Sequence, residues 1–184
     1  QINLAITNLL LGRNNDALQL LEAAWETAHS EGADHIAAMA DAEAGECLLQ
    51  LRRLQEALKK SQRSAELADA RGMVYEHGRA LHLEARVFGE MGRHQEALDV
   101  LEKAKQLFAK EGNNAWVAMS DLEIAVILGW QGKHEDSWET AIECVSILTQ
   151  QELPFGRASA QLVAARAALA REDQASARDL LEDV

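Results

Sequence analysis

Small and apolar residues recur at helical spacing along the whole chain, and the arrangement repeats every 40 residues. In residues 92–104, GRHQEALDVLEKA, the positions of Ala97, Leu98, Leu101 and Ala104 advance by one, three and three, which places them on one face of a helix. Similar stretches begin at residues 12, 52, 132 and 171. This pattern predicts ten helices joined by short turns. We expect them at residues 1–11, 14–30, 33–51, 54–71, 74–91, 94–111, 114–131, 134–151, 154–170 and 173–184.

Three columns of small residues persist when the sequence is read in steps of 40. Small side chains are needed where two helix backbones approach closely in a tightly packed interior. The columns are therefore predicted to be the surfaces through which the helices pack. They hold Ala5, Gly45, Ala85, Ala125 and Ala165; Ala17, Ala57, Ala97, Ser137 and Ala177; and Ala24, Ser64, Ala104 and Cys144.

Residues that end helices stand between the predicted helices at the same spacing. Glycine is favoured just past a helix end because it adopts a left-handed backbone conformation at little cost. At the last junction Glu172 takes the glycine position, and Pro154 suits the first turn of the helix that follows ELPFG. The glycines at these junctions are Gly12, Gly32, Gly72, Gly92, Gly112 and Gly132.

A single pair of such helices cannot bury its apolar face alone, whereas stacked pairs bury it against one another. The sequence therefore predicts an all-α fold, a right-handed α-solenoid of about five helix-turn-helix repeats. We expect one repeat domain over residues 1–184, with repeats at about 1–32, 33–72, 73–112, 113–152 and 153–184. The pattern is already running at Gln1 and still running at Val184, which indicates a fragment of a longer protein.

The register of small residues resembles that of tetratricopeptide repeats. In this family a small residue late in the first helix is followed by a turn glycine and then by two alanines of the second helix. Ala85, Gly92, Ala97 and Ala104 match that order, and so do the corresponding residues of the first repeat. The usual period is about 34 residues, whereas this chain has 40, and its repeats lack the usual terminal proline. Such 40-residue versions resemble repeats of bacterial signalling and regulatory proteins and of peptide-holding scaffolds.

Composition narrows the classes of partner. Lys plus Arg number 18 against 30 Asp plus Glu, and the net charge of −12 disfavours binding of nucleic acid by this segment. No apolar run approaches the roughly 20 residues of a membrane span, so no membrane partner is expected. Cys47 and Cys144 lie inside helical stretches and are predicted to be buried thiols in a reducing, cytoplasmic compartment.

The resemblance implies a concave groove lined by the first helix of each pair, where family members bind peptides. Arg79 and Arg86 lie two turns apart on one helix face, where they either pair with acidic groups of a partner or bridge to Glu43 and Glu46. Trp130 is either an aromatic anchor for a peptide or a ring packed against the next repeat. The candidate groove residues are Met39, Glu43, Glu46, Arg79, His82, Arg86, Glu90, Met119, Glu123, Trp130 and Arg166.

The sequence contains no recognisable motif for catalysis or cofactor binding. It contains no Cys-x-x-Cys, no His-Glu-x-x-His and no glycine-rich phosphate loop. His94 and His134 occupy the same repeat position in a turn, about one repeat apart, which is too far for a shared metal ion. We therefore predict no enzymatic activity, no metal and no cofactor.

Three functions remain open on the sequence. The leading hypothesis is a protein-interaction module or scaffold that binds a peptide or a partner domain, including another domain of the same full-length chain. The alternative is a ligand-sensing regulatory domain of a bacterial signalling or transcription-regulatory protein. A third is a structural spacer that joins an effector domain to its trigger.

Overall fold

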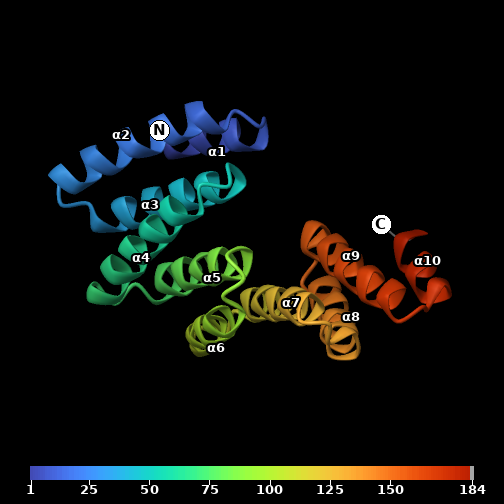
Figure 1. Ribbon diagram of the computed structural model, residues 1–184. Helices are drawn as coiled ribbons and strands as arrows, with labels where there is room; N and C mark the ends of the chain where they lie inside the picture. Colours follow the sequence, from blue (N-terminus) through green and yellow to red (C-terminus); the bar gives the residue numbers. More distant parts are fainter. Residues whose placement is uncertain (183–184) are drawn as a thin grey trace. The chain divides into compact units, whose positions relative to one another are not determined.

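The computed structural model describes residues 1–182, which form ten α-helices and no strand (Figure 1). The ends of the predicted helices agree with the observed ones to within one residue, except that the predicted end at residue 184 lies outside the described residues, and the all-α repeat fold is confirmed. The helices are α1 (Ile2–Leu10), α2 (Asn14–Ser30), α3 (Asp34–Gln50), α4 (Leu54–Ala70), α5 (Val74–Glu90), α6 (His94–Lys110), α7 (Asn114–Trp130), α8 (His134–Gln150), α9 (Pro154–Ala170) and α10 (Gln174–Glu182).

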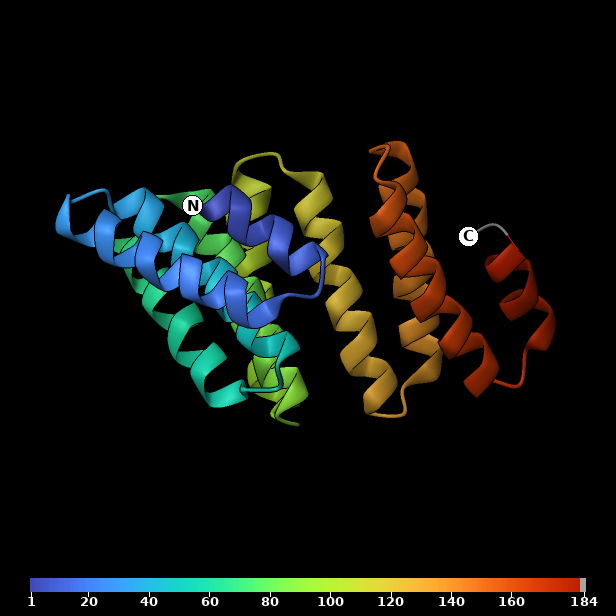
Figure 2. The same ribbon diagram turned by 90° about the horizontal axis from the view of Figure 1, so that it is seen from above.

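Contacts between helices divide the chain into two compact units, Gln1–Leu107 and Phe108–Val184. In the first unit, each helix from α1 to α5 packs on the next, and in the second unit α7 to α10 do the same (Figures 1 and 2). Phe108 at the end of α6 stacks on Trp116 of α7, with ring centroids 5.3 Å apart. The expectation of one repeat domain over residues 1–184 stays a prediction.

The first helices of successive pairs form a row within each unit. Contacts join α1 to α3 and α3 to α5 in the first unit, and α7 to α9 in the second. Over the described residues, no contact joins α2 to α4 or α8 to α10. A row of helices that touch one another lies on the inner side of a curved stack, because the outer row is spread further apart. The first helices therefore form the inner face of each unit.

All nine turns between helices use the same backbone geometry, spaced 20 residues apart. After α2, the N–H of Gly32 donates to the carbonyl of His29 (3.3 Å) and the N–H of Ala33 to that of Ala28 (2.8 Å). These two bonds satisfy carbonyls that the helix end would leave unpaired, and they require a left-handed residue. Six turns place glycine there, whereas Arg52 (φ 60°), Glu152 (φ 55°) and Glu172 (φ 63°) take the same conformation without glycine. The predicted role of Glu172 is thus confirmed.

The columns of small residues are buried where first and second helices cross. A Cβ on Gly45 would lie 2.7 Å from Leu83 Cδ2 and 3.5 Å from the carbonyl oxygen of Ala57. Where a column carries a polar atom, that atom bonds to the backbone of the facing helix: the hydroxyl of Ser137 donates to the Ala125 carbonyl at 2.7 Å. The predicted packing surfaces are therefore confirmed.

The two cysteines are buried and free, as predicted. The thiol of Cys47 donates to the carbonyl of Asn14 at 2.9 Å, and that of Cys144 to the carbonyl of Ala118 at 3.3 Å. Burial raises the pKa of Cys47, which keeps it a neutral thiol. Within residues 1–182, no helix is both long and apolar enough to span a bilayer.

Candidate partner-binding surface

All the candidate groove residues lie on first helices, and they fall into two sets. The set on α3 and α5 belongs to the first unit, and the set on α7 and α9 belongs to the second. The first set is Met39, Glu43, Glu46, Arg79, His82, Arg86 and Glu90; the second is Met119, Glu123, Trp130 and Arg166.

Ion pairs join α3 and α5 across the inner face of the first unit. Arg79 Nη2 lies 2.8 Å from Glu43 Oε1, and Arg86 Nη1 lies 2.5 Å from Glu46 Oε1. All four side chains are mostly buried, with between 13% and 32% of their surface exposed. The sequence left two roles open for the arginines. The contacts show the role in which both arginines bridge to glutamates of α3. Their charge is therefore already compensated within the unit.

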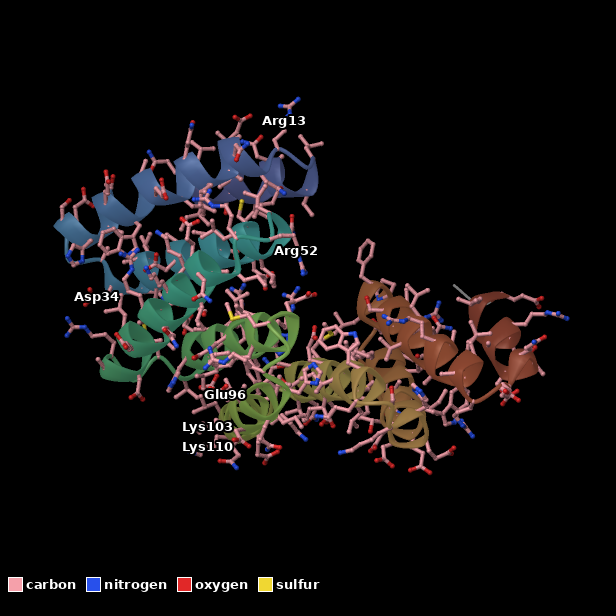
Figure 3. All side chains as sticks on the ribbon, in the orientation of Figure 1. Arg13, Asp34, Arg52, Glu96, Lys103 and Lys110 are labelled. Carbon is pink, nitrogen blue, oxygen red and sulfur yellow. The ribbon has the colours of Figure 1, made fainter. Side chains whose placement is uncertain are left out.

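A third pair extends this network to the turn after α3. Arg52, labelled in Figure 3, pairs with Glu90 at the end of α5. The guanidinium thus ties the turn between α3 and α4 to the next first helix. Both side chains are accessible to solvent, so this pair contributes little to stability.

His82 lies between the two arginines in the sequence of α5 but is almost entirely buried, with 4% of its surface exposed. Burial and the neighbouring charges of Arg86 and Arg79 lower its pKa to about 3. The imidazole is therefore neutral at physiological pH. So little of the ring reaches the surface that its main contacts are with this chain.

A buried carboxylate that sequence reasoning missed holds three helices of the first unit together. Asp41 of α3 has no exposed surface, accepts two hydrogen bonds from the guanidinium of Arg63 of α4, and lies 3.4 Å from Lys60 Nζ. The same guanidinium lies 3.8 Å above the ring of Trp25 of α2, which stacks on His29. The signal was present in AAMADAEAG, where one aspartate interrupts a run of small and apolar residues.

The first helices of the second unit carry exposed apolar side chains beside Glu123 and Arg166, in contrast to the ion pairs of the first unit. Along α9, Phe155 is 90% exposed, Leu162 49% and Leu169 54%. On α7, Met119 is half-buried against a core cluster, and Trp130 at the helix end is 41% exposed. Phe155 was missed as a candidate. The first-turn position that it occupies carries His35, Tyr75 and Ala115 in the other repeats.

A cavity of about 140 Å³ opens between α7, α8 and α9. Sequence reasoning missed it because helix packing forms it and no long loop is involved. Arg166 lines this cavity. Within residues 1–182, its guanidinium makes neither an ion pair nor a hydrogen bond. The cavity is lined by Ala125, Val126, Gly129, His134, Ser137, Val163, Arg166, Ala167 and Ala170.

The arrangement suits recognition of another molecule by shape, apolar contact and one charge. Within residues 1–182, no group of three or more His, Cys, Asp or Glu side chains is placed to hold a metal ion. His82, whose pKa is strongly lowered, belongs to the first unit and is not among the residues that line the cavity.

No protein-family model matches the sequence, and the search of curated proteins gave no match. Solved structures do match over almost the whole chain. A kinesin light chain-like protein of Podosopora anserina with nearly identical TPR-like repeats is 22% identical, with a TM-score of 0.71 over 98% of this chain and 90% of that chain. BtubC (BKLC) from P. vanneervenii is 14% identical, with a TM-score of 0.77 over 98% of this chain and 75% of that chain.

A third match is YrrB, described as a TPR protein with an unusual peptide-binding site. It is 19% identical, with a TM-score of 0.53 over 98% of this chain and 81% of that chain. At these identities the likeness concerns the fold. Together with the helix pairs, the small-residue columns and the repeated turns, it identifies the chain as a tetratricopeptide-like repeat fold with a period of 40 residues in place of about 34.

Proposed function

We propose that this chain is a non-catalytic protein-interaction module that binds a segment of a partner protein on the inner face of its first helices. The observation that carries the proposal is the ring of Phe155, in the first turn of α9, which has 90% of its surface exposed. A phenylalanine so exposed to water is unfavourable in isolation and typical of interaction sites.

The proposed binding surface lies on α7 and α9. The charged residues of α3 and α5 already satisfy one another, and a partner that displaced them would have to desolvate two ion pairs. On α7 and α9, by contrast, burial of Phe155, Leu162 and the exposed part of Trp130 is favourable. Glu43, Glu46, Arg79, Arg86 and Glu90 then serve to hold the first helices in their stack.

The partner is a protein or peptide, including another domain of the same full-length chain. That YrrB, with a related fold, has a peptide-binding site supports this class of partner. An acidic chain of net charge −12 is a poor surface for nucleic acid, which supports a protein partner over a nucleic-acid partner.

A second candidate, sensing of a small ligand, is favoured by one observation in the first unit. A hollow of about 460 Å³ lies beside α1, α2 and α3, and its lining includes Ile2, Ile36 and Met39. This volume falls in the range of small-molecule pockets, whereas the 140 Å³ cavity by Arg166 lies below it. Such a ligand would act at α1–α3 in the first unit, whereas α9 belongs to the second unit.

The test is a peptide-display selection against the whole chain, followed by titration of the selected peptides. Two variants are compared with wild type: Phe155→Ser/Leu162→Ser, which makes these exposed positions of α9 polar, and Leu10→Ser, which removes an equally exposed leucine from α1 in the first unit. We expect the double variant to weaken binding about tenfold or more and Leu10→Ser to leave it unchanged.

Thermal unfolding of each variant checks that the fold is intact, since exposed apolar side chains contribute little to stability. The proposal is wrong if no peptide is enriched over the bare support. It is also wrong if the selected peptides bind wild type and the double variant equally well. Binding lost only on substitution of Met39 and Ile36 would favour the hollow beside α1–α3.

A further inference from the structure

The cavity between α7, α8 and α9 lies at positions that larger side chains fill in the first unit. Gly129 and Val163 line the cavity, whereas the residues 80 positions earlier are Leu49 and Leu83. Those two leucines are buried, with 7% and 2% of their surface exposed. The smaller side chains leave a hollow of about 140 Å³ in the second unit.

This cavity belongs to the interior of the second unit. Its α7 and α9 residues match the residues through which α3 and α5 meet in the first unit. Glu46 and Arg86 form an ion pair at that meeting point, and Val126 and Arg166 hold the matching positions beside the cavity. Helix α8 closes a third side. The space is therefore formed by three helices that the structure describes in full.

Arg166 gives this cavity a positive charge without a counter-charge. Arg86 Nη1 lies 2.5 Å from Glu46 Oε1, whereas Val126 on the preceding first helix offers Arg166 no carboxylate. Over residues 1–182, Arg166 has neither an ion pair nor a hydrogen bond. A guanidinium can hold a carboxylate through two parallel hydrogen bonds, which the ammonium group of a lysine cannot do. The site therefore suits a carboxylate from outside the chain.

The remainder of the lining is mostly apolar and sets the size of the ligand. Ser137 donates its hydroxyl hydrogen to the carbonyl of Ala125 at 2.7 Å, so His134 is the other lining side chain with a polar group to offer. An apolar cavity of about 150 Å³ holds a benzene ring. The hollow beside Arg166 is similar in volume, although drug-sized ligands need a larger pocket.

We propose that this cavity binds a small free carboxylic acid whose apolar part has about four to seven carbon atoms. The apolar part fills the hollow, and the carboxylate pairs with Arg166. Burial of the apolar part and the charge-assisted hydrogen bonds both favour the complex. A ligand with a single negative charge is favoured, because the whole chain carries a net charge of −12. This small-molecule site goes beyond the proposed protein-interaction function and does not depend on it.

A free acid fits the lining better than the carboxyl end of a peptide. A peptide end brings amide groups that lose their hydrogen bonds to water when they are covered. The hydroxyl hydrogen of Ser137 is already donated to the carbonyl of Ala125, which leaves little to pair with those amides. A free acid has no polar group besides its carboxylate, and Arg166 meets that need.

The experiment titrates the whole chain with benzoate and 3-methylbutanoate and follows backbone amide signals by NMR. Benzamide, which has the shape of benzoate without its charge, and 2-naphthoate, which has a larger apolar part, are titrated in parallel. The peptide acetyl-Gly-Gly-Leu tests whether a chain end is the true ligand. Thermal unfolding of each variant checks that the fold is intact.

Four variants are compared with wild type. Arg166→Gln removes the charge, Val126→Glu supplies the carboxylate that Glu46 provides in the first unit, and Gly129→Leu fills the hollow with the residue found at position 49. Arg13→Gln is the matched control, because it removes the charge of an exposed arginine in the first unit (Figure 3).

We expect wild type and Arg13→Gln to bind benzoate with a Kd of about 1 mM or tighter. Benzamide and 2-naphthoate should each bind wild type about tenfold more weakly than benzoate. Arg166→Gln and Val126→Glu should each weaken benzoate binding about tenfold and lose the preference for benzoate over benzamide. Gly129→Leu should abolish the binding of both compounds.

The proposal is overturned if neither acid gives saturable shifts with wild type. Equal affinity of wild type and Arg166→Gln for benzoate would exclude Arg166 as the anchor, and unchanged binding by Gly129→Leu would place the ligand outside the cavity. Tighter binding of acetyl-Gly-Gly-Leu than of either acid would show that the site takes a chain end. None of these results bears on the proposed function, which the peptide selection with Phe155→Ser/Leu162→Ser tests separately.

Discussion

The carboxylate of Asp41, which has no exposed surface, is held by the guanidinium of Arg63 from the next helix. Arg63 in turn covers the ring of Trp25, so that one charged contact joins α2, α3 and α4. A carboxylate in this position depends on its partner, because burial of an unpaired charge is strongly unfavourable.

Substitution Arg63→Met is therefore expected to destabilise the fold by about 3 kcal/mol, since it keeps most of the packing on Trp25 but leaves Asp41 with Lys60 alone. Urea unfolding at pH 7 measures the change. The matched control is Arg53→Met, because Arg53 pairs with Glu56 within one exposed helix turn and its loss should have little measurable effect. Equal destabilisation by the two substitutions would contradict the assigned role of the Asp41–Arg63 pair.

Replacement of Glu152 by glycine is expected to stabilise the protein. Glu152 adopts φ 55° at the turn position that six other turns fill with glycine. A residue with a side chain is strained by about 1–2 kcal/mol in this conformation. The greater flexibility of glycine in the unfolded chain offsets part of the gain, which leaves about 0.5–1 kcal/mol. Thermal unfolding measures the shift in Tm.

Two control variants show whether the gain from Glu152→Gly comes from relief of backbone strain. Arg52→Gly relieves the same strain but loses the pair with Glu90, so it should gain less than Glu152→Gly. Gly132→Ala introduces the strain at φ 78° and should cost about 1 kcal/mol. A lower Tm for Glu152→Gly would show that the left-handed turn residue is not strained.

His82→Gln is expected to make the protein less sensitive to acid. The pKa of His82 is lowered to about 3 in the folded state, whereas an unfolded histidine titrates near pH 6.5. The unfolded state therefore binds the extra proton between these values, and stability present above pH 6.5 is lost as the pH falls toward 3. Wild type should lose about 1.4 kcal/mol more per pH unit than the variant between pH 6 and pH 4. Unfolding curves at each pH test this, and parallel pH profiles would exclude a buried neutral histidine.

Glu84→Gln is expected to stabilise the protein at neutral pH. Burial raises the pKa of Glu84, although Gln62 Nε2 donates to Glu84 Oε1 at 3.0 Å. Because the folded-state pKa is above the unfolded value, the contribution of this group to stability is complete below about pH 4.3 and is lost as the pH rises through the folded pKa.

The amide does not titrate and can still accept the hydrogen bond from Gln62. The variant should therefore be more stable than wild type at pH 7, and this difference should shrink as the pH falls below 4.3. Chemical unfolding at pH 7 and pH 4 makes the comparison. A constant difference at both pH values would indicate a packing effect instead of a charge effect.

Much of the fold could be predicted because the same local sequence features recur in every repeat. Gly32, Gly72 and Gly112 mark helix ends through a backbone conformation that depends on the residue itself. Ala85 and Ala97 are buried because two backbones meet there in every repeat. Such features need only neighbouring repeats, and a period in the sequence reveals them.

The partners of individual polar side chains were harder to predict. Arg79 and Arg86 had two possible roles on the sequence, and only the distance between α3 and α5 brings Glu43 and Glu46 within reach of them. Nothing in the local sequence of Arg166 distinguishes it from Arg86. The difference depends on Val126, a residue 40 positions away, and on a cavity formed by three helices.

The sequence by itself therefore determined the helices, their turns, the small-residue packing surfaces and the class of repeat, since helix propensity, turn conformation and side-chain size act over a few residues or one period. Only the tertiary structure decided which charges are compensated, that His82 is buried, and that Phe155 is left exposed. These properties are sums of contacts from several helices, and the same residue type at the same repeat position has different neighbours in each repeat.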